Sequence, residues 1–503
     1  MEASPNATAA KHLDPAVTTL RPGDNCWRIE TASRATVIID AAEYFRAART
    51  AMLAAQQRIM LIGWDFDSRI DLIPGEESTD APHGLGEFII WLVKRRPELE
   101  IFLLRWDLGA LKALFRGSTI LTLLRWKAHA RITAQLDSSH PPAASHHQKI
   151  AVIDDCLAFC GGIDMTADRW DTRDHADENP LRLRPGGKPH SPWHDATTAL
   201  EGPAAAALGE LARERWRLAS GKVLPPVTAR GSCWPEGLAP QFHNIQVGIA
   251  RSQPEMPESP AVLEIERLYL DLIASARHMI YAESQYFASR RIAEVIARRL
   301  AEPDGPEIVL VNPHSAQGWL EPIAMDSARA RLHEALHRLD VHGRFRIYHP
   351  VTQGGQPIYV HAKILVVDDR VLRVGSSNMN NRSMRLDTEC DVVIDAALPA
   401  NAHLRPTIRG MRDGLLAEHL GCAPETVAAR IDAEGSLIAA IEALRGPGRS
   451  LVPYETPDLT TVEAWLADHE VLDPEGPEEM FEAIEKRGLF RRFSRLRRAR
   501  PRS

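Results

Sequence analysis

Apolar residues follow the same order of helix-like and strand-like patterns twice along the chain. In residues 41–57 apolar side chains recur every three or four positions, which predicts an amphipathic helix. A short apolar run at residues 59–62 then predicts a buried strand. The second series begins with a helix opened by Ser259 and Pro260, and a strand is expected at residues 279–282. The chain therefore repeats a helix–strand unit.

Both series continue to a second strand and then to a strongly apolar four-residue strand. The second strands are expected at residues 102–104 and 308–311. Each series closes with a further strand, at residues 196–200 and 391–394, and a helix. Helices between most strand candidates are typical of α/β domains. We therefore expect a duplicated α/β domain of two mixed, largely parallel sheets flanked by helices, with the functional site where the halves meet.

Changes in composition predict six segments. At 503 residues the chain exceeds one ordinary hydrophobic core, which agrees with two halves. A stretch rich in Pro, Gly and Ser separates them, and acidic and then arginine-rich stretches end the chain. The expected segments are an amino-terminal segment (1–34), a first half (35–221), a connecting segment (222–260), a second half (261–420), a helical and acidic region (421–485) and a basic tail (486–503).

The overall composition narrows the class of protein. Hydrophobic residues make up 44% and charged residues 25% of the chain, which is typical of soluble globular proteins. The formal net charge of −7 argues against general affinity for nucleic-acid backbones. Six cysteines without C-x-x-C spacing are expected to be reduced thiols.

Membrane contact is expected to be peripheral. The first residues lack the basic start and apolar run of a secretory signal. The best apolar stretches fall far short of the roughly 18–20 residues that span a bilayer. We therefore expect a cytoplasmic protein that reaches, at most, the inner face of a membrane.

The basic tail offers one means of such contact. Residues 486–503 contain Lys486 and eight arginines, with Leu489, Phe493 and Leu496 at helical spacing. A helix of this kind has an apolar stripe framed by guanidinium groups, as in helices that lie on anionic bilayers. A solubilising terminus, or one that binds the acidic residues 458–485, explains the composition equally well.

Two short motifs have the same residue types at the same spacing. They consist of His147, Lys149 and Asp154, and of His361, Lys363 and Asp368. In each, four apolar residues separate the lysine from the aspartate, and a pair of small residues follows at the same distance. Side chains two positions apart on a strand point to the same side, so each histidine shares a face with its lysine.

Two such pairs that face each other can act on a phosphodiester. One neutral imidazole attacks phosphorus and the other protonates the leaving oxygen. The ammonium groups of Lys149 and Lys363 stabilise the charge that builds up on the phosphate, which leaves no need for a divalent metal. The sequence has no H-E-x-x-H motif, calcium-binding loop or P-loop. We therefore expect neither a metal nor a cofactor at the site.

The motifs match the H-x-K-x4-D signature of the phospholipase D superfamily. Residues 375–383 resemble its G-S-x-N-x-N-x-R-S run, and residues 280–287 resemble the I-Y-x-E-x-Q-[FY]-F segment of its two-motif, eukaryote-type lipid enzymes. Residues 192–195 resemble the P-W-H-D that follows their first motif. The resemblance covers about residues 35–420, and it is closest to such lipid enzymes of bacteria.

The resemblance implies a duplicated phospholipase D-like domain with the corresponding activity. Such an enzyme hydrolyses the distal phosphodiester of glycerophospholipids to phosphatidic acid and a free headgroup alcohol, and it can transfer the phosphatidyl group to another alcohol. The resemblance further implies a phosphohistidine intermediate, with His147 as the nucleophile and His361 as the acid.

Other residues are expected to support the two histidines. An imidazole that acts as a nucleophile usually has a carboxylate on its other nitrogen. Alignment of the strands that follow the motifs gives this role to Asp195 and Glu389. Asp164 and Asn378 each lie seventeen residues after a motif histidine (147 + 17 and 361 + 17). With Ser376, they are assigned to binding of the substrate phosphate, and their chemical difference makes the half-sites unequal.

The roles of several further residues remain open between chemistry and structure. Asp154 and Asp368 belong to the catalytic motif by resemblance, but each lies in a turn-like sequence that indicates a structural role. His140 and His146 are expected to line the pocket or to be structural. Trp64, Trp106 and Trp193 are expected in the core or the pocket wall. Glu283 and Gln285 are expected to bridge the halves or to make structural hydrogen bonds.

Two other functions share this chemistry. Nucleases that resemble the superfamily are often short chains with one motif, whereas this chain carries both and is acidic. A cardiolipin-synthase-like phosphatidyltransferase usually has amino-terminal membrane spans, and none is seen here. We therefore expect a monomer that binds a phospholipid substrate at a membrane surface and does not bind nucleic acid. A scaffold without activity is disfavoured because neither motif has lost a reactive residue.

Overall fold

The computed structural model describes residues 17–457, except 78–79, 108–124, 127, 142–143, 229–230, 257–258 and 318–321. The predicted basic tail and the acidic residues 458–485 lie outside the described residues.

The first half follows the predicted order of helices and strands. Its elements are β1 (Arg28–Ile39), α1 (Ala41–Ala54), β2 (Arg58–Gly63), α2 (Leu85–Arg95), β3 (Glu100–Trp106), β4 (Ile132–Asp137), β5 (Ile150–Ile153), β6 (Leu157–Gly161), β7 (Trp193–His194), β8 (Ala196–Glu201) and α5 (Pro203–Ser220). The helix predicted at residues 41–57 is α1, which ends three residues earlier because β2 begins at Arg58. The motif histidine and lysine lie immediately before β5 rather than within a strand.

The second half repeats this order and extends it. Its elements are β9 (Phe242–Gln253), β10 (Val262–Leu263), α6 (Glu264–Ser275), β11 (Met279–Glu283), α7 (Arg290–Leu300), β12 (Glu307–Val311), η1 (Pro322–Asp326), α8 (Ser327–Leu339), β13 (Phe345–Val351), β14 (Tyr359–Val360), β15 (Ile364–Val367), β16 (Val371–Gly375), η2 (Arg382–Leu386), β17 (Glu389–Asp395), η3 (Pro399–Leu404), α9 (Arg405–Leu420), α10 (Pro424–Glu434), α11 (Leu437–Leu444) and β18 (Ser450–Pro453).

The α/β class with mixed sheets and flanking helices is confirmed, but the two expected sheets are one. Sixteen strands form a continuous sheet in which β1 pairs with β9 and β9 pairs with β17. β9 is twelve residues long and lies within the segment 222–260 that was expected only to connect the halves. The halves are therefore joined through the backbone of the sheet.

The expectation of largely parallel strands is wrong. Only β2–β3–β4 and β11–β12–β13 pair in parallel within the large sheet, and its other pairs are antiparallel. The motif strands β5 and β15 each enter a hairpin through two aspartates with left-handed backbones: φ is 50° and 51° at Asp154 and Asp155, and 53° and 51° at Asp368 and Asp369. Tight turns of this kind join antiparallel neighbours.

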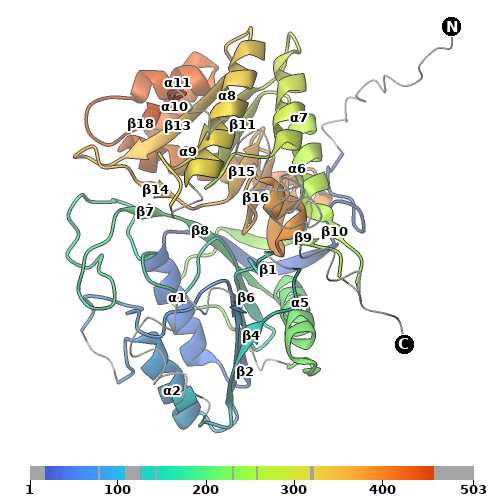
Figure 1. Ribbon diagram of the computed structural model, residues 1–503, viewed down its shortest axis with the longest axis vertical. Coiled ribbons are helices and arrows are strands. Elements are labelled where there is room, and N and C mark those ends of the chain that lie inside the picture. Colours follow the sequence, from blue (N-terminus) through green and yellow to red (C-terminus); the bar gives the residue numbers. More distant parts are fainter. Residues whose placement is uncertain are drawn as a thin grey trace, which may run out of the picture.

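Helices cover both faces of the sheet in each half. In Figure 1, α1 and α2 lie on one side of the first-half strands and α5 lies on the other. Apolar side chains of α1 and α2 form one core with the strands beside them, and those of α6 and α7 form a corresponding core in the second half. A third core runs through both halves and includes side chains of α5 and α9.

A second, smaller connection between the halves lies beside the large sheet. β7 of the first half pairs in parallel with β14 of the second, where the halves meet in Figure 1. β7 and β14 immediately precede the two segments that carry Asp195 and His361. None of the helices in the described part of the chain combines the length and apolarity needed to cross a bilayer.

Candidate active site

A pocket of about 440 Å³ lies at the junction of the halves, and both motif histidines line it. The backbone N–H of His147 donates to the carbonyl of Thr388 at 3.0 Å. The backbone N–H of His361 donates to the carbonyl of His194 at 2.7 Å. Each histidine is thus anchored by the opposite half of the molecule.

The two carboxylates expected beside the histidines are also exchanged between the halves. Nδ1 of His147 lies 2.9 Å from both carboxylate oxygens of Glu389. Nδ1 of His361 lies 2.7 Å from Oδ2 of Asp195. In both pairs the other ring nitrogen, Nε2, is free of the carboxylate, and both imidazoles line the same pocket. The geometry therefore brings these four residues together as two crossed pairs.

Glu389 is held by two hydroxyl groups. Oγ of Ser376 donates to one carboxylate oxygen at 2.5 Å, and Oγ of Ser383 donates to the other at 2.7 Å. Ser376 is fully buried behind Glu389. The hydroxyl of Ser376 is committed to the carboxylate that faces His147, and Ser376 is not among the described residues that line the pocket, so its predicted role in phosphate binding stays a prediction that this contact does not favour. Ser383 also donates its hydroxyl to Glu389, a role that the sequence alone did not reveal.

Asp195 is held by the first half. One of its oxygens accepts the backbone N–H of Ala196 at 2.8 Å. A methyl group at Gly162 would collide with the Asp195 carboxylate. The small residue that follows the first motif is thus required for the carboxylate beside His361 to keep its place.

The two lysines lie beside their histidines but have different partners. Nζ of Lys149 donates to the carbonyl of His147 at 3.0 Å and lies 3.4 Å from Oδ2 of Asp164. Nζ of Lys363 donates to the carbonyl of His361. Both lysine side chains are buried. They place two ammonium groups behind the pocket.

Asp164 and Asn378 both line the pocket, but a carboxylate and an amide have different partners there. Asp164 pairs with Lys149 and also accepts the backbone N–H of Trp64 at 3.0 Å. Oδ1 of Asn378 has no hydrogen-bond partner among the described residues. Asn378 thus presents a neutral amide to the pocket, whereas Asp164 already neutralises a lysine.

Burial sets the protonation of these groups. Burial and the nearby Lys149 and Lys363 hold the pKa of His147 well below its usual range, and burial with the charge of Lys363 does the same for His361. Burial raises the pKa of Glu389 to about 8 and lowers that of Lys363 to about 7. It also raises the pKa of Asp195. Both imidazoles are neutral in the empty site near pH 7, as a nucleophile requires.

The motif aspartates lie at the other end of the motif strands. The Asp154 carboxylate accepts the backbone N–H groups of Gln56, Gln57 and Arg58 at 2.6–2.8 Å. Asp368 accepts those of residues 277–279 at 2.7–3.0 Å. Each aspartate fixes the start of a neighbouring strand, which favours the structural role indicated by the turn sequences over the catalytic role implied by the resemblance.

Aromatic rings form much of the pocket wall. Trp64 stacks on Trp106 with ring centroids 5.6 Å apart, and Trp193 stacks on Tyr359 at 4.6 Å. The guanidinium of Arg169 lies 4.2 Å over the Trp193 ring. The three tryptophans considered as core or pocket wall thus line the pocket. Arg169 and Tyr359 were missed, because nothing in a single sequence links them to the motifs except the two-residue spacing between Tyr359 and His361.

The remaining candidates divide between pocket and support. Gln285 lines the pocket and donates to the hydroxyl of Tyr359 at 2.9 Å. Glu283 is buried and bridges the halves by accepting from Nε2 of His194 at 2.8 Å. His146 is fully buried with Nδ1 2.9 Å from the hydroxyl of Thr388, so its role is structural. His140 lies 3.0 Å from Asp107 beside the wall.

Two family models match the two halves in turn. The model described as "Phospholipase D" matches residues 51–228, and the one described as "Cardiolipin synthase, PLD-like domain" matches residues 269–411. Each match contains one of the H-x-K motifs.

Curated proteins of plants and of an amoeba are similar to the chain. Phospholipase D alpha 1 of Nicotiana tabacum is 25% identical over 403 residues, which cover 56% of this chain and 50% of that protein. Phospholipase D A of Dictyostelium discoideum is 25% identical over 416 residues, 69% of this chain and 31% of that protein. The chain thus spans half or less of the length of these two relatives.

A solved structure has a similar fold. Phosphatidylserine synthase from Haemophilus influenzae Rd KW20 superimposes with a TM-score of 0.54 at 14% sequence identity. The match covers 92% of this chain and 96% of that one. This likeness extends the agreement in fold over both halves.

Proposed function

Because the chain belongs to the phospholipase D superfamily, whose members act on phosphodiesters, we propose that it is a phospholipase D. In this proposal it hydrolyses the distal phosphodiester of glycerophospholipids to phosphatidic acid and a free headgroup alcohol. The observation that carries the proposal is the pair of crossed contacts, His147 with Glu389 and His361 with Asp195, at one pocket. The buried ammonium groups of Lys149 and Lys363 each donate to the backbone carbonyl of the motif histidine.

In the first step His147 attacks phosphorus. Glu389 accepts a hydrogen bond from Nδ1 and so leaves the lone pair on Nε2, the nitrogen that is free to face the substrate. A bond forms between Nε2 and phosphorus while the bond from phosphorus to the headgroup oxygen breaks. Lys149 and Lys363 stabilise the added negative charge on the phosphoryl oxygens, and the amide of Asn378 donates to one of them.

His361 supplies the proton to the leaving oxygen. In the empty site the nearby lysine charge and burial hold its pKa low. The anionic phosphate of a bound substrate offsets that charge, so His361 takes up a proton that the Asp195 carboxylate stabilises. His361 then returns to the neutral form and accepts a proton from the water that releases phosphatidic acid from His147.

An alcohol in place of water gives phosphatidyl transfer, which is the second candidate function. The description of the family model that matches residues 269–411 as a cardiolipin synthase-like domain favours it. The two reactions share the phosphohistidine and differ only in the acceptor. A nuclease remains an outcome of the test below rather than a proposal.

The pocket wall suits an amphiphilic substrate. The ring faces of Trp64, Trp106 and Trp193 offer apolar surface beside the cationic Arg169. We expect the glycerol backbone and first acyl carbons to lie against the rings. We propose that the basic tail makes a peripheral contact with anionic membranes. The segment boundaries at residues 35, 222, 261 and 421 are likewise proposals.

The activity is tested with the purified full chain and three kinds of substrate. Phosphatidylcholine and phosphatidylglycerol vesicles and a single-stranded oligonucleotide are each incubated in EDTA, with and without ethanol. We expect phosphatidic acid without ethanol and additional phosphatidylethanol with it, and loss of both in His147→Ala. His403→Ala, an exposed histidine on η3, is the matched control and should retain full activity. Cleavage of the oligonucleotide alone would overturn the proposal.

A further inference from the structure

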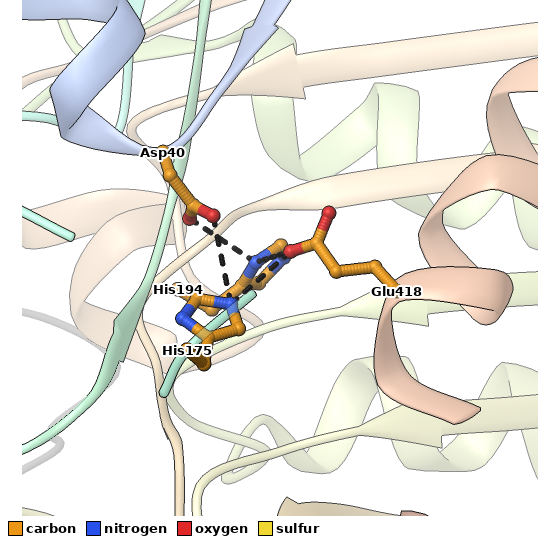
Figure 2. Close-up of side chains that lie close together, drawn as sticks. All are labelled: Asp40, His175, His194 and Glu418. Carbon is orange, nitrogen blue, oxygen red and sulfur yellow. Dashed lines mark hydrogen bonds and ion pairs between the residues drawn. The ribbon is translucent and has the colours of Figure 1, made fainter. Parts of the chain in front are cut away.

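A second group of titratable side chains lies buried behind the pocket. It consists of Asp40, His175, His194 and Glu418, and we call it the Asp40 cluster. All four are buried, and in Figure 2 their side chains point toward one common centre. Asp40 immediately precedes α1 and His194 lies on β7, whereas Glu418 comes from α9 of the other half. None of the four is among the described residues that line the pocket.

The separations between these atoms, 2.8–3.5 Å, suit ligands around one small cation as well as hydrogen-bonded ion pairs. Oε1 of Glu418 lies 2.8 Å from Nδ1 of His194 and 3.2 Å from Nε2 of His175. Asp40 oxygens lie 3.3 Å and 3.5 Å from the same two nitrogens. Tetrahedral ligands at about 2.0–2.1 Å from a zinc ion are about 3.3–3.4 Å apart.

The outer nitrogens of both histidines are already bound to carboxylates. Nδ1 of His175 lies 3.0 Å from Asp171, and Nε2 of His194 lies 2.8 Å from Glu283. Each of these carboxylates also accepts from a buried group, Arg182 for Asp171 and the Tyr281 hydroxyl for Glu283. Histidines that bind metals characteristically donate their other N–H to a carboxylate in this way, which fixes the ring and its tautomer.

The centre of the Asp40 cluster requires positive charge, which either a cation or additional protons on the two histidines can supply. If each ring carries one proton, on its outer nitrogen, the inner nitrogens of His175 and His194 present lone pairs toward Asp40 and Glu418. If both rings are charged, the same contacts are hydrogen bonds, and the surrounding carboxylates do raise the pKa of His175 to about 9 and that of His194 above its usual range. Within the described part of the chain, Nδ1 of His194 and Oδ2 of Asp40 make no hydrogen bond, although both are buried. Two carboxylates and two lone pairs repel one another unless positive charge lies between them.

We infer that the Asp40 cluster is a binding site for one divalent transition-metal ion, with Zn²⁺ as the ion that its two imidazoles and two carboxylates fit best. All four positions are filled by protein, so the ion is structural. It joins α9 of the second half to the first half. Its effect reaches the active site through Asp40: the backbone N–H of Asp195 donates to Oδ1 of Asp40 at 3.1 Å, and that of Asp40 donates to the Asp195 carbonyl at 2.8 Å.

Metal content and coordination geometry test the inference. The full chain, without a polyhistidine tag, is expressed in minimal medium supplemented with Zn²⁺ or with Co²⁺ and is dialysed against a metal-free buffer. We expect about one ion per chain by mass spectrometry of the metal. The cobalt form should show the intense visible absorption of a four-coordinate ion. Both measurements are independent of catalytic activity.

Two neighbouring variants separate ligand loss from general damage. Glu418→Gln removes a ligand, whereas His419→Gln changes the next residue of α9, which is equally buried and bonds to Glu283 at 3.1 Å but is not in the Asp40 cluster. Loss of a supporting group alone weakens metal binding about 10–100-fold, and loss of a ligand should weaken it at least as much. Only preparations with a cooperative thermal transition are compared.

The inference is supported if Glu418→Gln loses the ion and the cobalt absorption while His419→Gln keeps both. It is overturned if the wild-type chain carries no stoichiometric ion from either medium, since the cluster would then be held by protons on its histidines. Equal metal content in both variants, or loss from His419→Gln alone, would also overturn it by placing the ion elsewhere.

Discussion

Replacement of Glu389 by Gln tests the crossed arrangement most directly. The substitution keeps the length and shape of the side chain but removes the negative charge that Glu389 carries above its pKa of about 8, so the two proteins are compared above that pH. Glu389 faces Nδ1 of His147 at 2.9 Å and receives hydroxyl hydrogen bonds from Ser376 and Ser383. An amide N–H directed at Nδ1 would moreover hold His147 in the tautomer that carries its proton on Nε2, which cannot attack phosphorus.

The expected loss follows from the charge that develops on His147. As the Nε2–phosphorus bond forms, the ring becomes positive at about 4–5 Å from the carboxylate centre. At an effective dielectric constant of about 20 this attraction is roughly 4 kcal/mol. Each 1.36 kcal/mol is about tenfold in rate. The rate of phosphohistidine formation should therefore fall by about 10²–10³-fold in Glu389→Gln.

The assay compares good and poor leaving groups before steady state. Phosphatidyl-p-nitrophenol needs little protonation of its leaving oxygen, whereas phosphatidylcholine needs a proton from His361. Glu389→Gln should slow the first turnover of both substrates, because both require the nucleophile. Asp195→Asn should slow the first turnover of phosphatidylcholine but leave the burst of p-nitrophenol nearly unchanged.

Two results would refute this reasoning. A p-nitrophenol burst in Glu389→Gln within about threefold of the wild-type rate would mean that the carboxylate does not support the nucleophile. A burst that is lost in Asp195→Asn and kept in Glu389→Gln would exchange the roles of His147 and His361. Both results leave the superfamily assignment untouched, so the assay addresses the roles alone.

Three further predictions concern pH, stability and membrane contact. The value of kcat/KM should rise with pH as Glu389 ionises, since burial raises its pKa to about 8, and should fall as Lys363 loses its proton, since burial lowers its pKa to about 7. Lys363→Arg should remove the fall on the alkaline side. A wild-type profile that does not change with pH would contradict this prediction. Asp154→Asn should lower the free energy of unfolding in urea by about 1–3 kcal/mol, because one of the two oxygens that accept backbone N–H groups becomes an NH2 donor facing a donor. Its kcat should be unchanged, and lost turnover at normal stability would return Asp154 to the catalytic set. The full chain should co-sediment with phosphatidylglycerol vesicles at low salt more than a chain that ends at Glu485, and equal binding would discard the basic tail as an anchor.

The sequence was most informative where the structure depends on local pattern. The helix α1 and the strands β2 and β11 follow from apolar periodicity, and the turn residues Asp154 and Asp368 follow from turn chemistry. The pairing of β1 with β9 could not be predicted, because the partners are about 200 residues apart and nothing local marks them as neighbours. For the same reason two sheets were expected where one exists.

Side chains whose role depends on packing were also beyond the sequence. Ser376 lies in a run that resembles one of the superfamily, yet its hydroxyl faces Glu389, which only the pairing of β16 with β17 decides. The ligands of the Asp40 cluster come from residues 40, 175, 194 and 418, with no spacing that a metal motif would have. Sequence spacing reveals a site whose residues lie on one helix, strand or loop. The residues of the Asp40 cluster come from both halves, so no spacing reveals them.

The exchange of partners between the halves explains why duplication yields one site rather than two. Each motif brings a histidine and a lysine, but the carboxylate for each histidine, and the carbonyl that anchors its backbone, come from the opposite half. An isolated half would leave Nδ1 of its histidine without a carboxylate and its lysine buried without a substrate to neutralise. The pairing of β7 with β14 and of β1 with β9 therefore belongs to the catalytic apparatus. A shift of the β7–β14 pairing by one residue would displace His361 from Asp195, and a shift of the β9–β17 pairing would turn the side chain of Glu389 to the other face of the sheet.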